Sequence, residues 1–261
     1  MNEDTTHSRL SRRKLEKMAE ASSARDLAVL VTLGDCRYAT TRQLTALHFT
    51  ENATPKAATR AANRALAKLQ EDKLIASLDR RIGGVRAGSS DFVWSLTSGG
   101  SRLLNLEGEE GDEPRRRRHD PSPRFVEHAL ATTELYVQLN SIDGIDLTLA
   151  HFEPLCWRER LKPDMFAVTT DGEYEDHWFF ELDLATEAPS RVEQKCEQYE
   201  EYYLSGAEQV FPLVVWIVPD TKRQTSIREQ IAQSRTIKHK NIFTVITPNE
   251  LEGRVRKGAI I

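Results

Sequence analysis

Three carboxylates in the second half of the sequence stand where they could form a polar site. Asp164 opens a predicted strand, and Glu181 and Asp183 lie two residues apart in the segment HWFFELDL, residues 177–184. Because strand side chains alternate between faces, Glu181 and Asp183 are predicted to point the same way. A carboxylate between apolar neighbours in such a strand is costly unless it is paired or bound to a metal. Glu181 is therefore the strongest candidate for a functional group.

A structural explanation of the two aspartates also stays open. Asp164 and Asp183 sit near the ends of predicted strands, where they can cap the strand or pair with Arg158 and Arg191. Glu181 is harder to explain in this way because it lies inside the apolar strand.

Basic residues gather on one predicted helix and on the hairpin after it. Thr54-Pro55 is typical of a helix start, and the helix should run to about Asp72 with a buried stripe of small and apolar residues. The hairpin loop, RRIGGVRAGSSD over residues 80–91, is rich in glycine and arginine. We predict that both contact double-stranded DNA, the helix reaching base edges and the loop holding phosphates. The predicted contacts are Lys56, Arg60, Asn63 and Arg64 on the helix and Arg80, Arg81 and Arg86 in the loop.

The elements that must position these residues fall into two domains of an α+β and α/β protein. Residues 1–23 form an arm or a short helix, 24–105 a helix-rich winged helix-turn-helix domain, 106–123 a linker rich in charge and proline, and 124–261 the second domain. In the first helix, over residues 25–33, Leu30 and Val31 should face inward and Gly34 should end the helix. In the second domain the predicted order is α-β-β-β-α-β-α-β.

That order resembles the PD-(D/E)XK, or restriction-endonuclease-like, nuclease superfamily. The matching residues are Pro163-Asp164 and Glu181-Leu182-Asp183. The resemblance implies phosphodiester hydrolysis with Mg²⁺ or Mn²⁺, held by Asp164 and Glu181 with Asp183 assisting. Position 183 holds aspartate where the superfamily has a lysine, so Lys195 on the next helix is the predicted substitute, which positions water or stabilises charge.

The whole chain resembles the replication-relaxation family of plasmid and mobile-element proteins. The resemblance is carried by the winged-helix pattern, the helix with His128, Pro163-Asp164, and ELDLATE at 181–187 followed by Lys195 and Tyr199. It implies a role in plasmid DNA replication, relaxation or transfer.

Composition favours a globular protein of the cytoplasm. The 261 residues are 39% hydrophobic and 29% charged, with a net charge of −4 and three widely spaced cysteines. The pattern favours free thiols, and no apolar run approaches the ~18 residues of a membrane span. The sequence leaves the oligomeric state open, with a homodimer among the possibilities.

Several functions remain in competition at this point. The first hypothesis is a metal-dependent endonuclease or nickase delivered to DNA by the winged helix. The second is a non-catalytic DNA-binding replication initiator or transcriptional regulator, and the third is an adaptor that recruits a partner. A tyrosine relaxase is disfavoured, because no metal-binding histidine pair accompanies Tyr199, Tyr202 and Tyr203.

Overall fold

The computed structural model describes residues 10–78, 91–106, 121–185 and 189–260 of the chain. Two compact units, residues 1–133 and 134–261, each contain helices and strands, in agreement with the predicted α+β class. The boundary between them falls inside helix α6 (Pro123–Asn140). In the described parts of the chain no helix is long and apolar enough to cross a membrane. The predicted hairpin arginines Arg80, Arg81 and Arg86 and most of the predicted linker lie outside the described residues.

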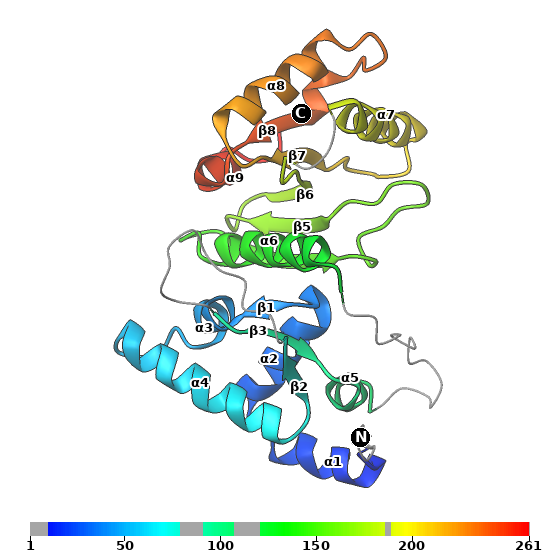
Figure 1. Cartoon of the computed structure of the whole chain (residues 1–261). Helices are drawn as coiled ribbons and strands as arrows, with labels where there is room; N and C mark the ends of the chain where they lie inside the picture. The colour runs from blue at the N-terminus through cyan, green and yellow to red at the C-terminus, as the bar shows by residue number, and fades with distance from the viewer. Residues whose placement is uncertain (1–9, 79–90, 107–120, 186–188, 261) are drawn as a thin grey trace. The chain divides into compact units, whose positions relative to one another are not determined.

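The first unit is a group of helices with a small antiparallel sheet (Figure 1). Its elements are α1 (Arg12–Ala21), α2 (Ala24–Cys36), β1 (Ala39–Thr40), α3 (Thr41–His48), α4 (Pro55–Glu71), β2 (Ile75–Ser77), β3 (Val93–Leu96) and α5 (Ser98–Leu104). Strand β3 lies between β1 and β2 and is antiparallel to both.

Helix α4 begins and packs as its sequence predicts. The Thr54 hydroxyl accepts a hydrogen bond from the Ala57 amide at 3.2 Å, and proline occupies the first helical position. This cap satisfies one of the amides that a helix start otherwise leaves unpaired. The buried stripe consists of Ala58, Ala62, Leu66 and Leu69. Burial of this stripe turns the opposite face of α4 toward solvent.

Helix α2 differs from the prediction in its end and in its buried face. It continues through Gly34 to Cys36, and Val31 is 47% exposed while Val29 and Leu33 are buried. Gly34 lies inside the helix, and its missing side chain leaves room for Leu104. A Cβ at this position would stand 3.3 Å from a methyl group of Leu104. The predictions for Gly34 and Val31 are therefore wrong.

The described part of the N-terminal segment contains a packed helix. In α1, Leu15 is 1% exposed and belongs to the core of the first unit. The Arg102 side chain donates to the Leu10 carbonyl at 2.6 Å, and Arg12 donates to the Leu106 carbonyl at 3.0 Å. These bonds join α1 to the region of α5 and leave α1 as part of the first unit.

The second unit is built on a five-stranded mixed sheet. After α6 come β4 (Asp146–Phe152), β5 (Met165–Thr170), β6 (Glu175–Leu182), α7 (Pro189–Ser205), β7 (Leu213–Ile217), α8 (Thr221–Gln233), β8 (Phe243–Ile246) and α9 (Leu251–Val255), with short 3-10 turns at 240–242 and 248–250. The predicted order of helices and strands is confirmed. The strands lie in the order β4-β5-β6-β7-β8, antiparallel as far as β6 and parallel from β6 to β8.

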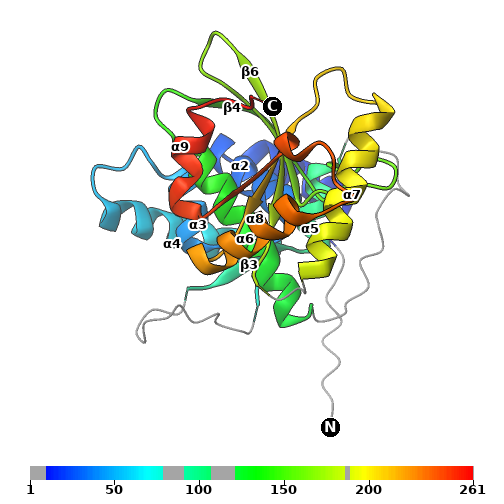
Figure 2. The same ribbon diagram turned by 90° about the horizontal axis from the view of Figure 1, so that it is seen from above.

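The two faces of β6 have different neighbours. Phe179 packs with Tyr199 of α7, their ring centroids 5.7 Å apart, in a core cluster that also includes Ile227 of α8. Helices α7 and α8 contact each other (Figures 1 and 2). Trp178 and Phe180, which alternate with Phe179, stack on each other at 6.1 Å. The predicted alternation along this strand is therefore confirmed, and residue 181 faces α7.

Candidate functional site

The antiparallel pairing of β5 and β6 holds Asp164 beside the end of β6. The Asp164 amide donates to the Phe180 carbonyl at 3.1 Å, and Asp164 Oδ2 accepts the Leu182 amide at 2.7 Å. These two bonds reach the residues on either side of Glu181. Asp164 and Glu181 are both buried, so the strand register brings the two predicted carboxylates to one place.

Glu181 is held by two side chains of α7. Its side chain is 1% exposed; Oε2 pairs with the Lys195 ammonium, and Oε1 accepts the Tyr199 hydroxyl at 2.5 Å. Lys195 and Tyr199 are four residues apart, so they lie one above the other on the same helix face. The Lys195 side chain is 27% exposed and therefore connects the buried carboxylate to solvent. The structure thus brings together Glu181 and its predicted cation.

Burial dominates the electrostatics of this cluster. It raises the pKa of Glu181 to about 8, the Lys195 charge lowers that pKa, and the Asp164 charge raises it. Burial and the Glu181 charge also raise the pKa of Tyr199 well above its ordinary value of 10.0. The phenol is fully buried and protonated, so it acts as a hydrogen-bond donor and does not present an exposed nucleophile.

Asp183 makes a separate buried ion pair. Arg223 of α8 donates from Nε to Asp183 Oδ2 at 2.5 Å, and the Ala185 amide donates to Oδ1 at 2.8 Å. The Asp183 and Arg223 side chains are 2% and 13% exposed. Asp183 therefore pairs with an arginine that the sequence did not suggest, while Arg158 pairs with Glu208.

The residues around Glu181 satisfy part of what a divalent cation requires. Among the described residues no group of three or more histidine, cysteine, aspartate or glutamate side chains has the arrangement of a metal site. Mg²⁺ is commonly held by only one or two carboxylates, with water and substrate phosphate supplying the other ligands. Two buried carboxylates, Asp164 and Glu181, are present here, and a carboxylate oxygen that already accepts one hydrogen bond can accept a further contact.

The predicted contact residues of α4 lie together on its solvent face. Lys56, Arg60, Asn63 and Arg64 are all exposed, and their spacing of four, three and one residues places them on one side of the helix. In the part of the chain that the structure describes, none of the four side chains makes a hydrogen bond or an ion pair. Lys68, one turn of helix beyond Arg64, pairs with Asp26 at 3.3 Å. The face is therefore basic and available.

A family comparison covers most of this architecture. The model of the replication-relaxation family matches residues 30–214, which span from α2 to the start of β7. The chain belongs to the replication-relaxation family. Membership points to a role in plasmid or mobile-element replication or relaxation. No curated protein and no solved structure matches this replication-relaxation protein.

Two partners in this replication-relaxation protein are not predicted from its sequence. The pattern predicts Tyr199 as a packing residue, although its spacing of four from Lys195 is a signal that both could reach one carboxylate. No local signal identifies Arg223, because it lies 40 residues from Asp183 and beyond the matched region. A contact of this kind arises only from the order of strands in the sheet.

Proposed function

We propose that this replication-relaxation protein binds double-stranded DNA through the exposed face of α4. The observation that carries the proposal is that the side chains of Lys56, Arg60, Asn63 and Arg64 share one solvent face and make no polar contact within the described residues. Cations left unpaired in this way can neutralise phosphates, and an asparagine beside them can pair with an adenine edge.

The arrangement of the first unit supports a winged-helix reading. Helices α2, α3 and α4 precede strands β2 and β3, and β1 completes the small sheet. In a helix-turn-helix of this kind the last helix enters the major groove. On this proposal α4 is the recognition helix, and the arginines at 80, 81 and 86 would hold the backbone phosphates.

A paired substitution tests the proposal. We expect the full-length Arg60→Ala/Arg64→Ala variant to bind a duplex of about 30 base pairs at least tenfold more weakly, with the salt dependence of log Kd reduced by roughly 2. Arg13→Ala/Lys17→Ala is the matched control, because these residues are exposed one turn apart on α1 and carry the same charge. Fluorescence anisotropy across a salt series measures both. Equal losses in the two variants, or no loss in the first, would overturn the assignment to α4.

We further propose that the Asp164–Glu181–Lys195 site hydrolyses a phosphodiester with Mg²⁺. The convergence of Lys195 on Glu181 supports this second function, since the lysine missing from position 183 is supplied from the next helix. Asp164 and Glu181 would hold the cation, which when bound supplies a hydroxide near neutral pH and neutralises phosphate charge.

The residues of the chain prepare this site in distinct ways. Lys195 favours the ionised form of Glu181 that a cation requires, since its charge lowers the pKa that burial raises. Tyr199 fixes the other carboxylate oxygen by donating its hydroxyl proton. Asp183 binds Arg223 and so joins the end of β6 to α8.

Nicking of supercoiled plasmid in Mg²⁺ or Mn²⁺ tests this function. We expect wild type to nick and both Asp164→Asn and Glu181→Gln to lose nicking, while each still binds the duplex. Asp146→Asn, an exposed aspartate on edge strand β4, should nick as wild type does. Duplex binding without nicking in either metal would instead favour a non-catalytic replication initiator or transcriptional regulator.

A further inference from the structure

The loop that leads into the candidate site is held by its own hydrogen bonds. This β4–β5 loop, residues 153–164, contains a backbone pair in which the Arg158 amide donates to Leu161 at 2.9 Å and the Leu161 amide donates to Arg158 at 2.6 Å. The Cys156 thiol donates to the Pro163 carbonyl at 2.9 Å. The loop therefore has a defined conformation immediately before Asp164.

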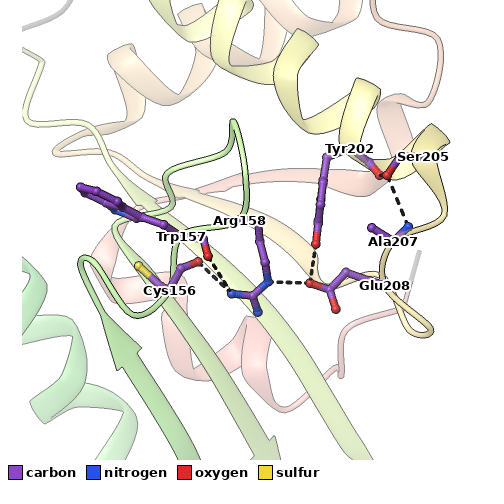
Figure 3. Close-up of polar contacts among 7 residues, drawn as sticks. All are labelled: Cys156, Trp157, Arg158, Tyr202, Ser205, Ala207 and Glu208. Atoms are coloured by element: carbon purple, nitrogen blue, oxygen red, sulfur yellow. Dashed lines mark hydrogen bonds and ion pairs between the residues drawn. The ribbon is translucent and has the colours of Figure 1, made fainter.

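An ion pair between Arg158 and Glu208 joins the loop to the chain segment after α7. Arg158 Nε donates to Glu208 at 2.8 Å, Nη1 donates to the Cys156 carbonyl at 3.1 Å, and the Tyr202 hydroxyl donates to the same Glu208 oxygen at 2.8 Å (Figure 3). The guanidinium also lies over the Phe179 ring, 5.7 Å from its centroid. The Arg158 guanidinium therefore has both its ionic partner and its aromatic partner within the second unit.

Trp157 is presented in the opposite direction. Its side chain points away from the Arg158 cluster (Figure 3) and is 40% exposed. The Lys162 ammonium lies over the indole ring, 4.5 Å from its centroid, and therefore occupies one ring face, while Arg160 is exposed in the same loop. A large aromatic ring held at the surface by a fixed loop, with cations beside it, is a form of single-strand recognition surface.

We infer that the β4–β5 loop stacks an unpaired nucleotide base on Trp157 and neutralises the adjoining phosphates with Arg160 and Lys162. The inference rests on the proposed action on DNA. Duplex bases have their faces covered by neighbouring bases, so an indole ring can stack only on a base that has left the helix. Because Glu208 takes the charge of Arg158, the loop offers two exposed cations against one exposed carboxylate, Glu159.

The β4–β5 loop connects the proposed stacking contact at Trp157 to the candidate site, because the loop ends at Asp164. The thiol of Cys156, next to Trp157, donates to the carbonyl of Pro163 at 2.9 Å, and Pro163 directly precedes Asp164. A base held by Trp157 is therefore anchored on the same loop that ends at Asp164. The preferred ligand of the second unit is a single-stranded or locally opened DNA segment.

Anisotropy titrations of the full-length protein with a labelled single strand of about 20 nucleotides and with its duplex test this inference. We expect Trp157→Ala to weaken single-strand binding roughly tenfold and to leave duplex binding unchanged. Trp157→Phe, which keeps a stacking ring, should retain most of the affinity. Tyr174→Ala is the control, since Tyr174 is 65% exposed in the β5–β6 connection and outside the loop. Circular dichroism and melting confirm that each variant is folded.

The outcomes separate this inference from the proposal on α4. Arg60→Ala/Arg64→Ala should weaken duplex binding and spare the single strand, which is the reverse of Trp157→Ala. No single-strand binding by wild type, an unchanged single-strand Kd in Trp157→Ala, or equal losses on both ligands would overturn the role of Trp157. Failure of the α4 proposal would appear only in the arginine variant.

Discussion

Glu181→Gln should change how the stability of this protein depends on pH. The folded state raises the pKa of Glu181 from its ordinary 4.5 to about 8, mainly through burial. A carboxyl group with a raised folded pKa binds its proton more tightly in the folded state. Its contribution to stability is therefore complete below pH 4.5 and is lost as the pH rises toward 8. Glutamine resembles the protonated carboxyl and does not titrate.

The size of the effect follows from proton linkage. One differentially bound proton changes the free energy of unfolding by about 1.36 kcal/mol per pH unit. Between about pH 5 and pH 7 the wild type should lose roughly 2 to 3 kcal/mol relative to Glu181→Gln. Other titrating groups are common to both proteins and cancel in the difference.

Urea unfolding in EDTA, followed by tryptophan fluorescence, measures this difference. Trp178 and Trp216 are buried in the sheet of the second unit and will report its unfolding. A wild-type-minus-variant difference that stays constant from about pH 5 to pH 8 would refute the reasoning. It would mean that Glu181 is ionised throughout and that Lys195 outweighs burial.

Three further substitutions have expected outcomes. Asp183→Asn should lower the free energy of urea unfolding by about 3 kcal/mol, because it removes the charged partner of the largely buried Arg223. Tyr199→Phe should lower it by about 1 to 2 kcal/mol through loss of the bond to Glu181, and plasmid nicking should survive because the phenol is only a donor. Thr54→Ala should lower the stability of the first unit by about 1 kcal/mol, measured by thermal melting, since it removes the α4 cap.

Local patterns in the sequence are sufficient to predict most elements of both units, although the short strand β1 is not predicted. The start of α4, its buried stripe and the alternation along β6 each depend on residues within one or two turns or on strand period. The failures involve neighbours that are distant in sequence. Gly34 lies inside α2, where Leu104 packs close to it, and no local rule anticipates that contact.

The candidate site is predictable in part. Glu181 stands out because a carboxylate inside an apolar strand needs a partner, and Lys195 is predicted through the resemblance to the nuclease superfamily, as the substitute for the lysine missing at position 183. The partner of Asp183 depends on which helix follows β7 and on the parallel pairing of β6 with β7. Residues on separate elements meet only once the sheet order is established, so Arg223 could not be predicted.

The pairing of Asp183 with Arg223 has a consequence for how this sequence can evolve. Asp183→Lys alone would take the carboxylate from Arg223 and add an ammonium to the face that carries Glu181. Changing Arg223 first would instead leave a buried aspartate charge without this cation. Either order passes through a destabilised intermediate. Descendants of this chain are therefore expected to keep the lysine at position 195 of α7, because single mutations do not readily move it back to position 183.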